Sequence, residues 1–207
     1  MYKLVILLFC CIASCHLNAH TSEMTFAELV IVRHSGYDYD VTKPVPKALL
    51  IQLAQTAHYS PSSYNEQPWS FIFCDKKETP EAYSKLLGTL AVNNQKWAQN
   101  APVLILVSAN EVLRKNNKPN RWAQYDTGAA AMSLVYKAAS LGLMPHEMGG
   151  FDDKKVRQLF SLPASYTPMA VIAIGYEQPN ANGIQEKKRN PLSSQFFWGD
   201  WANGIAP

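Results

Sequence analysis

The sequence has little cysteine beyond its first fifteen residues. Three of the four cysteines, Cys10, Cys11 and Cys15, lie near the N-terminus, so a processed chain keeps Cys74 and at most Cys15. An internal disulfide framework is therefore excluded. Cys74 ends the apolar run Phe71–Phe73 and has no His, Asp or Cys at ligand or triad spacing. This pattern favours a buried strand residue over a nucleophile or a metal ligand.

The sequence also lacks a strong excess of either charge and a glycine-rich dinucleotide motif. Charged residues make up 17% of the chain, the net charge is +3, and the basic residues are dispersed apart from short runs. Nucleic-acid binding gains little support from this balance. No G-x-G-x-x-G is present, so a Rossmann site is not indicated. With 207 residues, 47% of them hydrophobic, the chain has the size of one globular domain.

No hydrophobic run is long enough to cross a membrane as a helix. The longest N-terminal run, Leu4–Ala13, follows Lys3, and this layout predicts a secretory signal over residues 1–19. One candidate cleavage site for the signal follows Ala19. The other precedes Cys15 in a sequence that resembles a bacterial lipoprotein box. The first predicts an exported, periplasmic protein, and the second predicts a protein whose only membrane contact is a lipid anchor.

A different start is also compatible with the sequence. Met24 opens Met-Thr-Phe-Ala-Glu-Leu, and translation from this residue would give a cytoplasmic protein without a signal. In either case we expect one folded domain over residues 24–201.

Helical and strand patterns alternate along this domain. Thr25 and Glu28 form a capping box that predicts a first helix ending near Arg33, and Pro46 begins a second helix that ends before Ser60. Further helices are predicted at 79–87, 126–141 and 152–160, and buried strands at 70–74, 103–108 and 170–175. The alternation indicates a layered α/β or α+β domain.

Two groups of polar residues suit a phosphorylated, planar ligand. Arg33-His34-Ser35 provides a cation, a hydroxyl and amides at a helix end, which suits a phosphate or a polyol, although a solvated helix end would look similar. The stretch Ser60–Trp69 combines hydroxyls, amides and an indole beside turn-forming prolines. This combination suits a heteroaromatic ligand with several donors and acceptors.

Two further groups complete the pattern. Gly149 and Gly150 precede a helix capped by Asp152, and a backbone without side chains can approach a ligand closely. Lys187 and Arg189 lie in a basic run that is more typical of a solvated surface. Together with the arginine of the first group they would supply three cations for one phosphate dianion.

These groups, in this order and at these separations, resemble the nitroreductase family of flavoproteins from about Met24 to Trp201. The Asp-Thr-Gly-Ala-Ala-Ala sequence at Asp126–Ala131 contributes to the likeness. The resemblance implies an α+β fold with a central mixed or antiparallel sheet flanked by helices. It also implies a homodimer onto which the C-terminal segment extends, and the aromatic run Phe196–Trp201 fits such an arm.

The resemblance further implies FMN as cofactor and NADH or NADPH as electron donor. The family's roles would give a cofactor site formed by Arg33, His34, Ser35, Tyr37, Pro61, Ser62, Ser63, Asn65, Asn93, Lys96, Gly149, Gly150, Lys187 and Arg189. Of these, Pro61, Ser62, Ser63 and Asn65 would reach the flavin of the neighbouring subunit. Where family members commonly carry Arg or Lys, this chain has Tyr37, which affects the expected tuning of the flavin potential.

The activity implied is hydride transfer from NAD(P)H to flavin N5, followed by reduction of a nitroaromatic compound, a quinone or a similar small acceptor in a ping-pong cycle. No side chain needs to act as acid, base or nucleophile, because the cofactor carries the redox chemistry. Two alternatives stay open. One is an exported flavin-binding protein without turnover; the other is dehalogenation or flavin fragmentation on the same fold, for which no added lid motif is present.

Overall fold

The computed structural model describes residues 24–181 and 188–206. Its helices are α1 (Phe26–Val32), α2 (Lys47–His58), α3 (Pro80–Leu87), α4 (Val92–Ala98), α5 (Ala123–Ser140) and α6 (Asp153–Leu159). Its strands are β1 (Trp69–Asp75), β2 (Val103–Asn110), β3 (Met144–Met148) and β4 (Tyr166–Gly175). Short 3₁₀ turns lie at Ser63–Asn65 and Leu192–Ser194. The predicted signal at residues 1–19, including Cys15, lies outside the described residues.

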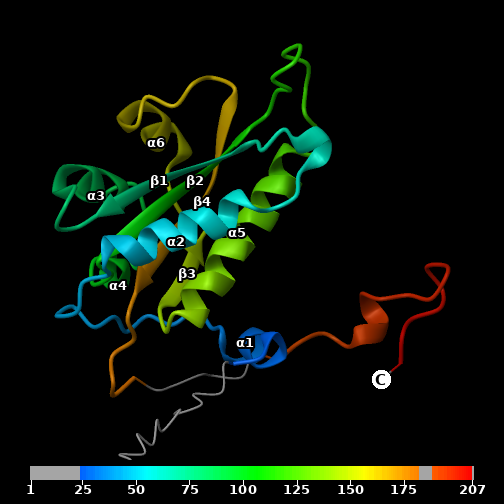
Figure 1. Ribbon diagram of the computed structural model, residues 1–207, viewed down its shortest axis with the longest axis horizontal. Helices are drawn as coiled ribbons and strands as arrows, with labels where there is room; N and C mark the ends of the chain where they lie inside the picture. The colour runs from blue at the N-terminus through cyan, green and yellow to red at the C-terminus, as the bar shows by residue number, and fades with distance from the viewer. Residues whose placement is uncertain (1–23, 182–187, 207) are drawn as a thin grey trace, which may run out of the picture.

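The four strands form one antiparallel sheet in the order β1-β2-β4-β3. Helices α2 and α5 pack on one face, and α3, α4 and α6 lie on the other side (Figure 1). The fold is therefore α+β, as predicted.

The alternation of side chains along β2 explains the two layers. Val103, Ile105 and Val107 contribute to the cluster beneath α2 and α5, whereas Leu104 and Leu106 contribute to the opposite cluster. All five are essentially inaccessible to solvent. A strand buried on both faces has a continuous apolar sequence, and this apolar run is what predicts the strand.

The capping predictions are confirmed at two helices. The Thr25–Glu28 capping box is formed, and the Asp152 side chain accepts from the Lys155 N–H. Thr79 occupies the N-cap position of α3, at the start of the helix predicted from 79, but its side chain makes no capping hydrogen bond. Its hydroxyl bonds the backbone of Asp75 instead, accepting from the N–H and donating to the carbonyl.

Two elements lack a sequence signal. Strand β3 contains Pro145, His146 and Glu147, a combination that is unusual in a strand but is tolerated at a sheet edge, where a missing N–H costs no ladder bond. Helix α4 begins after Ala91 without a side-chain cap. Helix α5 begins at Ala123, three residues before the predicted start, and the Asn120 side chain accepts from the N–H of Trp122, the N-cap residue.

Cys74 is a free, fully buried cysteine on β1. Burial raises the pKa of its thiol to about 11, so the thiolate is not populated near neutrality. The prediction of an inert strand residue is confirmed.

Candidate functional site

The Arg33–Ser35 segment leaves α1 in an extended conformation, with Arg33 as the C-cap residue. Arg33 Nη1 lies 3.4 Å from Ser35 Oγ, so the guanidinium and the hydroxyl of the predicted phosphate-binding group are neighbours. Within residues 24–181 and 188–206 the only ion pair shorter than 4.0 Å joins His34 and Glu177, and Arg33 has no carboxylate at that distance. Its charge is therefore free to meet an anionic ligand.

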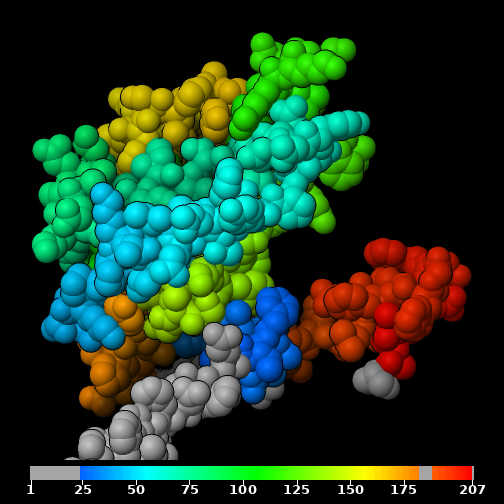
Figure 2. All heavy atoms as spheres, in the orientation of Figure 1, coloured from blue at the N-terminus to red at the C-terminus, as the bar shows by residue number. Residues whose placement is uncertain are grey.

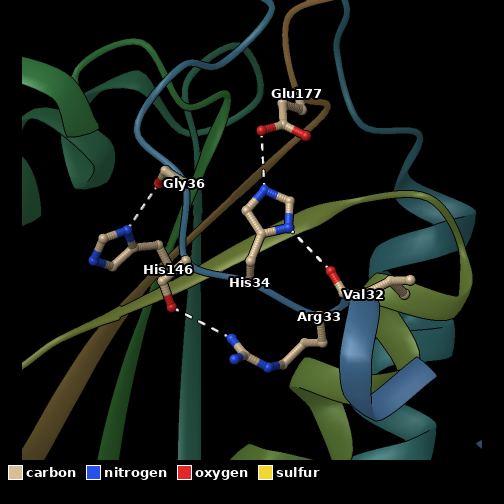
Figure 3. A network of polar contacts seen from close by, with 7 residues as sticks. Val32, Arg33, His34, Gly36, His146 and Glu177 are labelled. Atoms are coloured by element: carbon tan, nitrogen blue, oxygen red, sulfur yellow. Dashed lines mark hydrogen bonds and ion pairs between the residues drawn. The ribbon is translucent and has the colours of Figure 1, made fainter. Parts of the chain in front are cut away.

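The side chain of His34 is turned toward the protein. Its Nδ1 lies 3.0 Å from the carbonyl oxygen of Val32, and its Nε2 lies 2.9 Å from Oε1 of Glu177, which follows β4 (Figure 3). The imidazole thus fixes the segment against the sheet, and only the backbone of His34 is left for the predicted contact to a ligand.

Gly36 brings the chain against the edge strand. The Gly36 carbonyl oxygen lies 2.8 Å from His146 Nδ1 on β3 (Figure 3). A Cβ at this glycine would overlap the sulfur of Met144, so a larger residue would require the Met144 side chain or the segment to move.

Tyr37 is 54% exposed, but its ring packs against two others. Its ring centroid lies 5.2 Å from that of Trp97 on α4 and 5.0 Å from that of His146, and these two rings are 4.3 Å apart. The cluster joins the first predicted motif to α4, the helix that carries Asn93 and Lys96. Trp97 and His146 had no role in the sequence analysis.

Helix α4 in turn contacts the double glycine. The Ala91 N–H donates to the Gly150 carbonyl at 2.8 Å, and the Asn94 amide lies 3.3 Å from the same oxygen. Lys96 Nζ is 3.3 Å from Asn93 Oδ1. A Cβ on Gly149 would meet no atom within 4 Å, so the backbone there faces open space. Met148 belongs to β3, and the loop begins at Gly149.

Glu147 is the acidic member of this surface. It is exposed, but crowding by neighbouring protein atoms raises the pKa of its carboxyl above the usual value, and the positive charge of Arg33 opposes that rise. The two groups are therefore electrostatic neighbours.

Residues 33–37, α4 and residues 144–150 form one unit, which we name the β3-side region.

The Ser60–Trp69 stretch lies elsewhere. It holds Tyr64, Asn65 and Gln67 at positive φ angles of 53°, 54° and 48°, a conformation that non-glycine residues adopt only when their surroundings impose it. The Ser63 N–H donates to Oδ2 of the buried Asp126 at 2.9 Å, and the Ser62 hydroxyl accepts from the Gln67 N–H at 3.0 Å.

This loop sits at the N-terminal end of α5, whereas α1 packs near the other end of that helix (Figure 1). Asp126 holds the loop, and the ring of Phe26 on α1 contacts Tyr136, which is about 15 Å farther along the helix axis. We name residues 61–67, residues 111–121 and the start of α5 the α5-side region. One chain keeps its Pro61, Ser62, Ser63 and Asn65 apart from its own β3-side region.

The C-terminal segment stands off from the body of the molecule (Figure 2). It folds back on itself through a bridge between Phe197 and Gly204 and a stack of the Phe197 and Trp201 rings at 4.6 Å. Trp198 and Trp201 are 71% and 84% exposed. Arg189 is described and exposed, and Lys187 lies outside the described residues.

Comparison with known proteins identifies the family of this chain. Residues 30–176 match the model of the nitroreductase family. The chain belongs to this family.

Alignments with similar proteins span most of this chain. A nitroreductase relative from Methanothermobacter thermautotrophicus, provisionally named NADH dehydrogenase/NAD(P)H nitroreductase, is 30% identical over 80% of this chain and 84% of its own length. The crystal structure of an oxidoreductase containing FMN superposes with a TM-score of 0.78 at 30% identity, covering 88% of this chain and 96% of the other. A nitroreductase family protein of Clostridium difficile 630 gives 0.69 at 26% identity, covering 86% and 99%.

A membrane-spanning helix and a metal-binding cluster are both absent from the described residues. Across residues 24–181 and 188–206, no helix has the length and apolar character needed to cross a membrane. The same residues include no group of three His, Cys, Asp or Glu side chains placed to hold a metal ion.

Proposed function

We propose that this nitroreductase binds FMN and transfers hydride from NAD(P)H to a small acceptor such as a nitroaromatic compound or a quinone. The observation that carries the proposal is the β3-side region, which places Arg33 and Ser35 on the same strand edge as the open backbone of Gly149. The FMN named for a structure 30% identical to this chain supports the same cofactor.

The residues present suit the cofactor in charge and in access. Arg33 has no carboxylate within 4 Å among the described residues and can pair with the ribityl phosphate. The backbone at Gly149 can be approached without a side chain in the way, which suits a flat ring system. FMN, when bound, would supply the redox chemistry by accepting hydride at N5 and passing it on.

The acceptor would occupy the place that the nicotinamide leaves, which gives ping-pong kinetics. Side chains position both substrates and exclude water, but none needs to carry a proton as catalytic acid or base. We keep Lys187 and Arg189 as proposed phosphate partners, and Asn93 and Lys96 as proposed partners of the pyrimidine edge.

We also propose a homodimer in which Pro61, Ser62, Ser63 and Asn65 of one subunit complete the site of the other. Two features support it. The α5-side region lies apart from the β3-side region of its own chain, and the C-terminal segment exposes large aromatic rings that a partner would cover.

An anaerobic titration tests the activity. Purified holoprotein mixed with NADPH or NADH should lose its flavin absorbance, and the absorbance should return on adding a quinone. Bound flavin that neither donor bleaches would favour the exported carrier without turnover. Mass spectrometry of the mature N-terminus separates a lipidated Cys15, a start at His20 and a start at Met24.

A further inference from the structure

Residues 111–121 form a hairpin that the proposed function does not use. Val112 and Pro119 pair as an antiparallel bridge, the Leu113 N–H donates to the Lys118 carbonyl at 2.8 Å, and Asn117 turns the chain with a φ of 56°. The hairpin projects from the body beside the N-terminal end of α5 (Figures 1 and 2).

Positive charge is concentrated on this hairpin. It carries four basic residues against one acidic residue, Glu111, and this excess of three equals the net charge of the whole chain, +3. The four basic residues are all exposed, and in the described part of the protein none of their charged side-chain groups forms an ion pair of 4.0 Å or less: Arg114, Lys115, Lys118 and Arg121. Positive charges outnumber negative ones on the hairpin, and like charges repel one another, so the cluster is suited to an anionic ligand.

The hairpin is fixed to the loop that we propose as part of the flavin site. The Arg114 N–H donates to Glu66 Oε2 at 2.9 Å, and Arg114 Nη2 donates to the Gln67 carbonyl at 3.2 Å. Glu66 directly follows the Ser63–Asn65 turn. The cations are therefore held beside the site rather than on a remote surface.

Aromatic surface adjoins the cations. The guanidinium carbon of Arg121 lies 4.4 Å from the centroid of the Trp122 ring, and Trp122 and Tyr125 are 41% and 76% exposed. Exposed rings beside basic side chains suit a ligand that combines phosphates with a flat base.

We propose that this hairpin binds the adenosine-phosphate half of the NAD(P)H donor. The inference rests on the proposed function, because the nicotinamide end must reach the flavin while the phosphorylated adenosine end extends away from it. Lys115 and Lys118 are the phosphate-binding side chains, and Arg114 positions the hairpin on the loop. Two phosphate groups of the donor fit these lysines. One is the pyrophosphate, which NADH and NADPH both contain, and the other is the 2′-phosphate, which only NADPH contains.

The test is the double variant Lys115→Ala/Lys118→Ala, measured as holoenzyme. Loss of two exposed charge-assisted contacts should raise KM for the donor by about ten-fold while kcat changes little. An increase confined to NADPH assigns the 2′-phosphate, and an equal increase for NADH assigns the pyrophosphate. Reduced nicotinamide mononucleotide, which lacks the adenosine half, should react equally with variant and wild type.

A matched control removes two exposed lysines from helices α3 and α6, in Lys85→Ala/Lys154→Ala, and should leave every donor unchanged. Calorimetric titration of 2′,5′-ADP into holoprotein gives a readout without turnover, with an affinity about ten-fold weaker in the hairpin variant. Unchanged KM values together with unchanged 2′,5′-ADP affinity would overturn the proposal. A wild type that no donor reduces would count against the proposed function, whereas the titration would still test the hairpin.

Discussion

The β3-side and α5-side regions are built in different ways. In the β3-side region, rings and hydrogen bonds join three elements that are distant in sequence, as the Tyr37–Trp97–His146 cluster illustrates. In the α5-side region, a strained turn is held by one buried carboxylate, that of Asp126. We propose that the two regions are half-sites that meet across the homodimer.

The largest effect should come from the C-terminal segment. A chain truncated before Phe196 should lose most of its dimer and its flavin, because the segment's exposed rings would no longer cover a partner. Light scattering measures the mass, and the ratio of flavin to protein absorbance measures the content. The single subunit should still fold, since the buried core clusters draw on no residue of this segment, but its thermal midpoint should fall because the stabilisation by partner and FMN is lost. A fully flavinated dimer of the truncated chain would contradict the arm.

Arg33→Ala should weaken FMN binding by about ten- to a hundred-fold, because it removes a charge-assisted phosphate contact of about 1.5–3 kcal/mol. Reconstitution of apoprotein, followed by quenching of flavin fluorescence, measures the change. Arg157→Ala on α6 is the matched control and should bind as wild type. Equal affinity of both variants would remove Arg33 from the site.

Asp126 allows a sharper test of the other region. Asp126→Ala leaves the Ser63 N–H without its acceptor and should lower the free energy of unfolding by about 1–3 kcal/mol, with a loss of flavin. Asp126→Asn keeps an amide oxygen in place and should recover most of both. Urea unfolding and flavin titration of the pair check this prediction. Failure of the Asn variant to recover would show that the charge, not the acceptor, matters.

The smallest effect concerns Tyr37. A cation near the flavin pyrimidine stabilises the reduced, negatively charged form more than the oxidised form, and a tyrosine supplies no cation. Tyr37→Arg should therefore raise the midpoint potential by roughly 20–45 mV, which corresponds to about 1–2 kcal/mol for two electrons. Spectroelectrochemical titration at one pH measures it. An unchanged or lower potential with full flavin content would place Tyr37 away from the pyrimidine.

The sequence predicted the parts of the fold whose causes are local. The Thr25–Glu28 box and the apolar run of β2 carry their own signal, and both elements form where expected. Strand β3 and the Trp97–His146 contact do not, because they depend on pairing with β4 and on α4 packing across the sheet edge. The sequence marks Asp126 only as the start of a helix and as part of a family motif, because its role depends on Ser63 lying beside it in the fold.

The central claim is that each site takes one region from each of two chains. Co-expression of Arg33→Ala with Ser63→Glu, each under its own affinity tag, tests this most directly. Either variant alone should purify with little FMN, because every site in its dimer lacks one half. The doubly tagged heterodimer should recover one FMN per dimer, since one of its two sites draws both intact halves. A heterodimer as poor in flavin as its parents would show that each chain builds its site alone.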